Sequence, residues 1–170
     1  MIGHHLRLAG ALAAILLSIA SPAAGAQEGA LRCPLYTPYN PSNPFARTVR
    51  GELPASIIAQ DATVMAIIPL EWKHPGHALI ILKSAVRNLG DLSDADALAV
   101  LHMARRVAVA QQRALGSTGY SLQQNNASRQ DVCHFHLHVI PNTPAVPRVR
   151  PTRAEMDMIA ERLRAALPPQ

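Results

Sequence analysis

The sequence predicts one α+β domain built on an antiparallel sheet, with a leader segment in front of it. Three observations indicate this class: five short β-prone runs, two stretches with apolar residues at helical spacing, and an order in which most strands follow one another directly. Adjacent strands joined without long crossovers favour antiparallel pairing. With 170 residues, of which 49% are hydrophobic, the chain can bury a core and does not have the composition of a disordered protein.

The composition limits the classes of partner. Lys and Arg total 16 against 11 Asp and Glu, which gives a net charge of +5, but the arginines form no long basic block. Aromatic residues make up only 4% of the chain, which disfavours a stacking surface for single-stranded nucleic acid. We therefore expect no nucleic-acid partner, and we interpret the mild positive charge as a favourable field for a phosphorylated small molecule.

The first 26 residues have the layout of a secretory signal peptide. Arg7 precedes an apolar run over residues 8–19, and Pro22 and a small-residue triplet ending at Ala26 follow. The run is shorter than the roughly 20 residues that a transmembrane helix needs. We expect cleavage after Ala26, a periplasmic or secreted protein, and no stable membrane insertion afterwards. An uncleaved membrane anchor is the alternative.

Residues 27–43 are rich in Pro and polar residues and predict an irregular extension before a domain over 44–170. Export would expose the chain to an oxidising compartment, where Cys33 and Cys133 could form a disulfide. The sequence leaves two interpretations open, a disulfide or two separate thiols with Cys133 buried in a strand. Two cysteines are too few for a disulfide scaffold or a four-cysteine zinc module.

The first three strands are predicted over residues 56–59, 63–68 and 77–83. The first two runs, S-I-I-A and T-V-M-A-I-I, flank a short polar turn and predict a hairpin. Pro69 should end the second strand, because proline has no N–H to donate to the ladder. The third run, H-A-L-I-I-L-K, follows a loop that contains Pro and Gly.

A long helix, two further strands and a final helix complete the domain. Ser93 and Asp96 predict the start of the long helix and Gly116 its end. Its expected apolar stripe is Leu98, Leu101, Ala104, Ala108 and Leu115. Strands are expected over 119–125 and 132–140. Thr152 and Glu155 should open the last helix, whose expected stripe is Met156, Ile159, Leu163 and Ala166.

Three alternating histidines are the most informative feature of the sequence. In a strand, successive histidines of the set His134, His136 and His138 would lie on one face, roughly 6.6 Å apart. Phe135, Leu137 and Val139 would point the other way, into the core. Three interpretations stay open at this point: a catalytic row, a metal site, or structural residues. A neutral imidazole is a good nucleophile toward phosphorus, whereas three rings on one straight strand do not easily converge on one ion.

The sequence resembles the histidine-triad (HIT) family of nucleotide hydrolases and transferases. The run H-F-H-L-H-V-I-P from His134 to Pro141 is similar to the family signature. Four other segments match in order: R-G-E-L-P-A-S at 50–56, P-G-H-A-L-I-I-L-K at 75–83, L-S-D at 92–94 and G-Y-S-L-Q-Q-N-N at 119–126. The resemblance implies a five-stranded antiparallel sheet with a long helix and a C-terminal helix, and protomers that pair into a homodimer.

The resemblance also implies a reaction. HIT proteins attack the α-phosphorus of a nucleotide ester, anhydride or phosphoramidate, without a metal or organic cofactor. The nucleophile would be His136, which would form a transient nucleotidyl-histidine. His134 would orient it, partly through its backbone carbonyl. His138 would contact the phosphoryl oxygens, and His77 would be a supporting fourth histidine. A phosphoryl centre needs positive or donor groups around its oxygens, which backbone amides and a protonated His138 could supply. Hydrolysis, nucleotidyl transfer and non-catalytic binding of metal or nucleotide stay open as outcomes.

Further site residues are expected, Gln130 from the resemblance and Asp131 and Arg129 at positions that depart from the family pattern. Gln130 would contact the phosphate or the leaving group. Asp131 would be either the leaving-group acid or a polar strand residue. Arg129 would either contact a phosphate or block the pocket. Asn126, the last residue of the segment G-Y-S-L-Q-Q-N-N, is expected at the substrate as well.

Several positions depart from the family pattern. Pro69 stands where an acidic residue usually holds the ribose hydroxyls, so nucleoside recognition should be altered. Tyr36 and Ala85 stand where many bacterial members have a Cys and a His for structural zinc, so that site should be lost. Asn142 replaces a common Arg at the edge of the active site.

Overall fold

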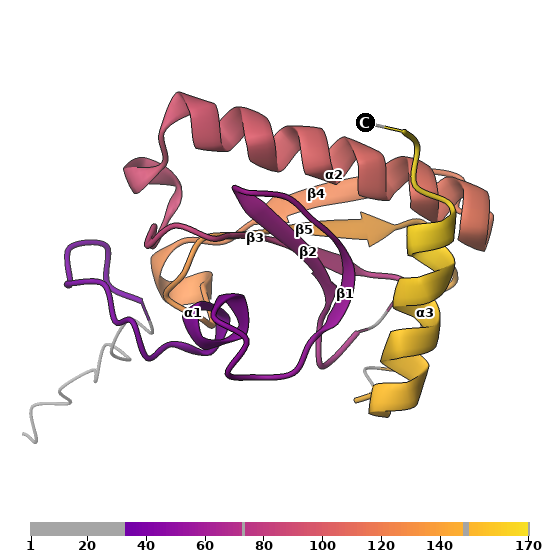
Figure 1. The fold of residues 1–170 in the computed structure, drawn as a ribbon, viewed down its shortest axis with the longest axis horizontal. Coiled ribbons are helices and arrows are strands. Elements are labelled where there is room, and N and C mark those ends of the chain that lie inside the picture. Colours follow the sequence, from indigo (N-terminus) through magenta and orange to yellow (C-terminus); the bar gives the residue numbers. More distant parts are fainter. Residues whose placement is uncertain (1–32, 73, 148–149, 170) are drawn as a thin grey trace, which may run out of the picture.

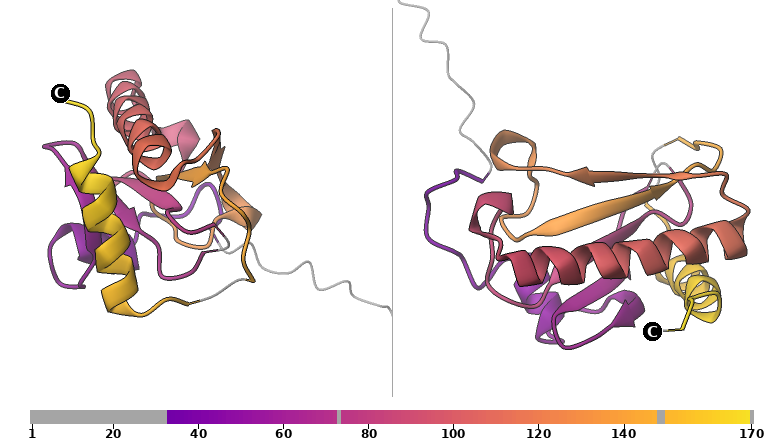
Figure 2. Two further views of the ribbon diagram at one scale, coloured as in Figure 1. Left: turned by 90° about the vertical axis from the view of Figure 1, so that its right-hand side faces the viewer. Right: turned by 90° about the horizontal axis from the view of Figure 1, so that it is seen from above.

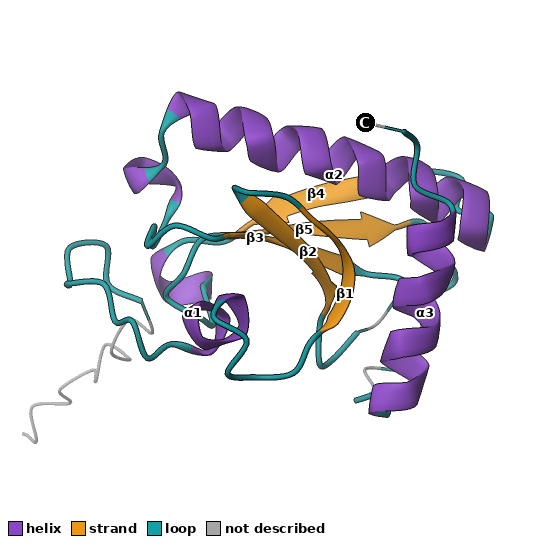
Figure 3. Ribbon diagram, viewed as in Figure 1, coloured by secondary structure: helices purple, strands orange, loops and turns teal. Residues whose placement is uncertain are grey.

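A computed structural model describes residues 33–72, 74–147 and 150–169 (Figure 1). The predicted signal peptide and the first part of the predicted extension lie outside the described residues. Residues 33–43 contain turns but no helix or strand, and Figure 3 shows them as a loop that leads into α1 (Pro44–Val49).

The core of the fold is a five-stranded antiparallel sheet, as the sequence predicts. The order across the sheet is β1-β2-β3-β5-β4. The strands are β1 (Ser56–Gln60), β2 (Val64–Ile68), β3 (Ala78–Leu82), β4 (Tyr120–Gln124) and β5 (His136–Pro141). Pro69 follows the last residue of β2, in agreement with its expected role as a strand terminator. β5 lies between β3 and β4, so His136 and His138 lie one strand in from the β4 edge of the sheet.

Alternation along the strands separates a helix-covered face from a second face. On the first, the alternate residues of β2 and β3 pack with Phe135, Leu137 and Val139 against α2 (Asp94–Leu115) and α3 (Arg153–Ala165). Figures 1 and 2 show α2 running lengthwise along the sheet, with α3 beside it. On the second face, Leu79 is the pairing partner of His138, and Ile81 of His136. This second face, partly covered by Phe45 of α1, carries the histidines.

The helix ends follow the predicted capping chemistry. Ser93 accepts a hydrogen bond from the backbone N–H of Asp96 at the start of α2, and Gly116 ends that helix with φ at 66°. Thr152 and Glu155 form a capping box at the start of α3. None of the described helices is long and apolar enough to cross a membrane.

The predicted apolar stripe of α2 is wrong at two positions. Leu98 and Leu101 are 71% and 53% exposed. The buried stripe runs through Val100, Met103 and Val107, together with Ala104, Ala108 and Gln111. Its 3–4 residue spacing is regular but one residue out of phase with the two leucines, because small alanines and a glutamine, which carry little hydrophobic signal, occupy half of the contact face.

Gln111 connects α2 to the backbone next to two of the histidines. Its side chain is fully buried, and its Nε2 donates to the carbonyl oxygens of Gly76 at 2.9 Å and of Val139 at 3.0 Å. These carbonyls belong to the residue before His77 and the residue after His138. The amide therefore holds the P-G-H turn next to β5, and Gly76 in this turn has φ at 89°, which favours glycine.

We expect Gln111→Leu to lower the free energy of unfolding by about 2 kcal/mol, because two buried carbonyls lose their donor. The substitution also removes the buried Oε1 of Gln111, which has no partner among the described residues, and this gain offsets only part of the cost. Urea denaturation would measure the change. Gln112→Leu, on the exposed side of α2, is the matched control and should change stability by less than about 0.5 kcal/mol. Equal effects of the two substitutions would contradict the bridging role.

Candidate active site

A pocket of about 620 Å³ opens on the histidine face of the sheet. Its floor includes Ile67 and Leu79 from the central strands together with His136 and His138. Phe45 of α1 lines one side. The remaining wall comes from the loops that contain Leu53–Ala55, Pro69–Glu71 and Asp131–Val132, and from Arg150 and Arg153. The volume is within the range of small-molecule sites.

The triad is not one continuous strand face, because β5 begins at His136 rather than near residue 132. The backbone N–H of His134 bonds to the Val132 carbonyl, and that of Phe135 to the Val86 carbonyl. These bonds bend the chain before the strand starts. His136 and His138 line the pocket, whereas His134 lies behind them and is 1% exposed.

The His136 ring is fixed in one tautomer. Its Nδ1 lies 2.8 Å from the backbone carbonyl oxygen of His134. A carbonyl can only accept, so Nδ1 carries the proton and Nε2 carries the lone pair. Burial lowers the pKa of His136 below its usual value, although the carbonyl bond and nearby Asp131 partly oppose this. The Phe45 ring packs edge-on at 4.9 Å between centroids. The result is a neutral, oriented imidazole with an unprotonated Nε2.

His134 is held by two partners of different kinds. Its Nε2 lies 2.7 Å from the Leu82 carbonyl oxygen, so this nitrogen donates. Its Nδ1 must then accept, and it lies 2.6 Å from the Tyr39 hydroxyl. Burial lowers the pKa of His134. Sequence reasoning missed Tyr39, because nothing in the P-rich extension indicates that it reaches the triad.

His77 and His138 form a second, hydrogen-bonded pair. The Nε2 of His77 is 2.9 Å from the Nδ1 of His138, and the rings are stacked. Burial, reinforced by neighbouring imidazoles, lowers the pKa of His77 to about 3 and that of His138 to about 4. His138 is therefore neutral near pH 7, and the expectation of a protonated His138 is wrong for this environment. Its Nε2 is buried and has no partner among the described residues.

The structure places Gln130 behind His136 rather than in the pocket. It is 1% exposed, and its Nε2 donates to the carbonyls of Arg87 at 2.6 Å and of His134 at 3.2 Å. The same His134 carbonyl thus receives Gln130 and His136. The side-chain N–H groups that were expected to contact a phosphate instead fix the backbone that orients His136.

The other expected binding residues divide into two groups. Asp131 lines the pocket and is exposed. Arg129 is exposed on the short 3₁₀ turn η2 (Ala127–Arg129) and does not line the pocket. Asn126 also lies outside the lining and bonds to Gln124 and to the backbone N–H of Leu89. The structure therefore brings His136, His138 and Asp131 together at the pocket but not Arg129 or Asn126.

The cysteines, left open by the sequence, form a disulfide between Cys33 and Cys133. Cys33 is thus unavailable as a zinc ligand, and Tyr36 beside it is 95% exposed. Among the described residues, no group of three or more His, Cys, Asp or Glu side chains is arranged to hold a metal ion. In the triad this follows from geometry, since both nitrogens of His134 and the Nδ1 of His136 already have partners.

The HIT domain family model matches residues 50–145. The chain belongs to the HIT family. The matched range includes β1 to β5, His77 and all three triad histidines, so the family assignment covers the whole pocket floor. The fold seen here, a five-stranded antiparallel sheet with helices, is the fold of solved members of the family.

Several characterised and solved proteins are similar to this HIT protein. The purine nucleoside phosphoramidase of Escherichia coli K12 is 30% identical over 106 residues, covering 61% of this chain and 89% of its own. The adenosine 5'-monophosphoramidase hnt1 of Schizosaccharomyces pombe is 31% identical over 99 residues, covering 57% and 71%. A Hit-like protein involved in cell-cycle regulation from Bartonella henselae superposes with a TM-score of 0.72 at 30% identity, covering 77% of this chain and all of that one.

We expect the free energy of unfolding to fall as the pH is lowered from about 6.5 to about 4. An imidazole in the unfolded chain has a pKa near 6.5 and therefore takes up a proton in this window. Folded His77 and His138 stay neutral through most of it, because their pKa values are about 3 and about 4. The unfolded state binds more protons and is stabilised by up to about 1.4 kcal/mol per pH unit for each group.

Denaturation at a series of pH values would measure this slope. His77→Gln should flatten the profile, because it removes one of the histidines whose pKa is lowered by burial. His102→Gln, at an exposed position of α2, is the control and should keep the wild-type profile. A His77→Gln profile that coincides with wild type would contradict the assignment.

Proposed function

We propose that this HIT protein is a hydrolase that attacks the α-phosphate of a nucleotide-like substrate through a covalent intermediate on His136. The family and its phosphoramidase members support nucleotide hydrolase chemistry in general terms. One observation carries the finer proposal: the bond from Nδ1 of His136 to the His134 carbonyl, in a ring that lines the pocket. It leaves the lone pair on Nε2, the atom that a nucleophile needs.

The proposed reaction has two displacements at phosphorus. In the first, the Nε2 lone pair of His136 forms a P–N bond while the bond from phosphorus to the leaving group breaks, and the leaving group takes a proton. In the second, a water oxygen attacks phosphorus, the P–N bond breaks and its electrons return to Nε2, while the water gives up a proton. Dividing one displacement into two lowers each barrier.

Neutral groups would stabilise the developing charge in this mechanism. If His77 donates through Nε2 to the Nδ1 of His138, the unpartnered Nε2 of His138 carries a proton that a phosphoryl oxygen can accept. Asp131 is the pocket carboxyl nearest in sequence to the triad, and it is our candidate for proton exchange with the leaving group. Hydrogen-bond donors rather than a metal would therefore stabilise the phosphoryl oxygens.

The pocket has no carboxylate at the end of β2 that could bind the ribose hydroxyls of a substrate, because Pro69 occupies that position. Pro69 lines the pocket at that point, among Ile67, Ile68 and Leu70. Proline offers neither a carboxylate nor an N–H. Glu71 lines the same wall but forms an ion pair with Arg150 at 3.1 Å. We therefore propose nucleoside phosphoramidates and dinucleoside polyphosphates as substrates, with weak selection for ribose.

Assembly and location are further parts of the proposal. β4 is the terminal strand of the sheet, and its Tyr120 and Leu122 are each 45% exposed. A second copy pairing there would cover them and extend the sheet, so we propose a homodimer. The disulfide supports a periplasmic or secreted location, because such bonds persist mainly in oxidising compartments.

Nucleotidyl transfer is the second candidate function, since the same intermediate can react with an acceptor other than water. The pocket wall also contains Arg153, whose positive charge favours an anionic acceptor such as phosphate or a sugar phosphate. Product analysis with these acceptors present separates transfer from hydrolysis.

We expect His136→Asn to lower kcat by about a thousandfold or more, because the covalent route is lost. A panel of nucleoside phosphoramidates, dinucleoside polyphosphates and nucleotide sugars would measure turnover, and mass spectrometry of quenched wild-type protein should detect a nucleotidyl adduct on His136. His74→Asn is the control, because His74 does not line the pocket. Wild-type turnover by His136→Asn, or an adduct on another residue, would overturn the proposal.

We expect ribonucleoside and 2'-deoxyribonucleoside phosphoramidates to have kcat/KM values within about threefold of each other. A lost hydrogen bond to a buried charged partner usually costs more than tenfold. Pro69→Asp, which restores a carboxylate at this position, should raise the preference for ribose. A strong ribose preference in the wild-type protein would contradict this part of the proposal.

A further inference from the structure

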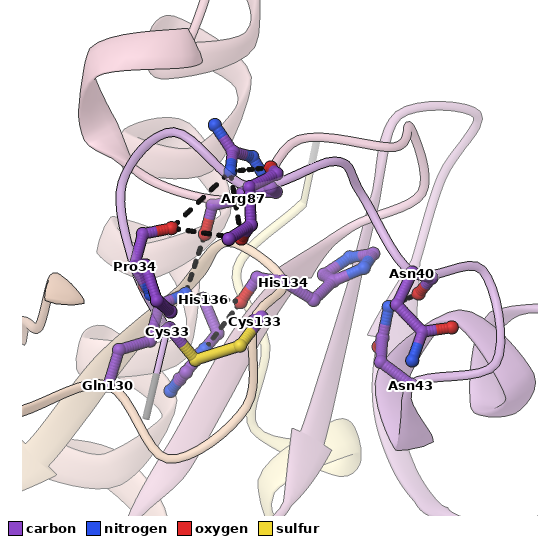
Figure 4. The surroundings of a disulfide bond; sticks show 10 residues. Cys33, Pro34, Asn40, Asn43, Arg87, Gln130, Cys133, His134 and His136 are labelled. Atoms are coloured by element: carbon purple, nitrogen blue, oxygen red, sulfur yellow. Dashed lines mark hydrogen bonds between the residues drawn. A yellow bond between two sulfur atoms is a disulfide. The ribbon is translucent and has the colours of Figure 1, made fainter. Parts of the chain in front are cut away.

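The segment before α1 lies against the triad although it is distant in sequence. The disulfide joins Cys33 to Cys133, 100 positions apart, with their Cα atoms 5.2 Å from each other. Cys133 immediately precedes His134. Figure 4 shows the disulfide beside Gln130, His134 and His136, where the hydrogen bond from the His136 ring to the His134 carbonyl is also visible.

Two arginines bind backbone carbonyls of this segment, residues 33–43. The guanidinium of Arg87 donates to the carbonyl oxygens of Leu35 and Thr37. It also donates to the Pro34 carbonyl at 3.4 Å, and Figure 4 shows Pro34 beside Arg87. Arg50 donates to the Pro41 carbonyl at 3.0 Å. The carbonyl of Arg87 in turn accepts from Gln130. The segment is therefore held at both ends, and its contacts lead to the residues that support His136.

Tyr39 lies between the carbonyls that Arg87 and Arg50 bind, and its side chain contacts His134. Its hydroxyl is 2.6 Å from Nδ1 of His134. Since the Nε2 of His134 must donate to the Leu82 carbonyl, Nδ1 can only accept, and the tyrosine O–H donates. With both nitrogens satisfied, the buried His134 ring has one tautomer and one orientation. Without the Tyr39 hydroxyl, a buried acceptor would lose its donor, and the His134 ring would keep only one of the two hydrogen bonds that fix it.

We infer that Tyr39 is a positioning residue for this reaction: it locks His134, whose carbonyl orients the nucleophilic His136, and the Cys33–Cys133 disulfide keeps Tyr39 in place. The inference rests on the proposed function of His136. The carbonyl that accepts from His136 belongs to the residue whose ring Tyr39 holds, so a shift of the whole His134 residue, ring and backbone together, also displaces the acceptor. A misaligned nucleophile lowers the rate of the chemical step more than it weakens substrate binding.

The disulfide has a separate role from the tyrosine. It fixes the chain at Cys33, six positions before Tyr39, to the residue next to His134. It therefore restricts both sides of the Tyr39–His134 contact. If the tether acts through this contact, loss of the disulfide and loss of the hydroxyl should not have additive effects, because each removes the same interaction.

The test compares wild type with Tyr39→Phe, with Cys33→Ser/Cys133→Ser, and with the triple variant, all as the full mature chain. We expect Tyr39→Phe to lower kcat about tenfold while KM changes less than about twofold. The double serine variant should also lose turnover, and adding Tyr39→Phe to it should lower kcat by less than about twofold more. Circular dichroism at the assay temperature checks that each variant is folded.

A spectroscopic readout separates positioning from general stability. In protein labelled with ¹⁵N-histidine, the Nδ1 resonance of His134 should shift in Tyr39→Phe, because its lone pair loses the hydroxyl donor. Tyr36→Phe, in the same segment but 95% exposed, is the matched control and should leave both kcat and this resonance unchanged.

Unchanged kcat and an unchanged His134 Nδ1 resonance in Tyr39→Phe would overturn the inference. A double serine variant with wild-type turnover would overturn the role of the tether. Failure of the proposed function is distinct from both, because it would appear as no turnover and no adduct in the wild type itself. The histidine resonances would then still decide whether Tyr39 holds His134.

Discussion

The bond from Nδ1 of His136 to the backbone carbonyl of His134 is the interaction on which the rest of the site depends. A neutral imidazole has one lone pair for chemistry, and the carbonyl decides which nitrogen has it. Around this bond the molecule places a buried glutamine that shares the acceptor, an aromatic ring from α1 and a sheet that fixes the strand. Burial keeps the imidazoles neutral and so favours nucleophilic and donor chemistry over positive charge.

The two faces of the sheet have different roles: one packs against the helices and the other forms the pocket. The helix-covered face contains nearly all of the large apolar cluster, and the opposite face contains the pocket. Because side chains alternate, β5 contributes Leu137 and Val139 to the core and His136 and His138 to the site. Gln111 connects the two sides, since it reaches from α2 to the backbone beside His77 and His138.

Local sequence patterns predicted the parts of the molecule that depend on neighbours along the chain. Alternating and helical spacings gave the five strands, the caps of α2 and α3 and the shared face of His136 and His138. Contacts between distant segments were not predictable in this way. Tyr39 at His134, the pairing of Cys33 with Cys133 and the inward orientation of Gln130 each depend on where a bend brings the chain. The phase error at Leu98 arose because alanines on the buried stripe give a weak signal.

The disulfide also bears on how the protein responds to proteolytic cleavage. Its two cysteines enclose α1, three strands, α2 and β4 in one covalent loop, with β5 and α3 downstream. A single cut anywhere in that loop, for example in the exposed connection around Ser84 and Ala85, leaves the two fragments attached to each other. The fragment with His77 and the fragment with the triad would then stay in one covalent molecule, so a single cleavage would not separate the histidines of the site.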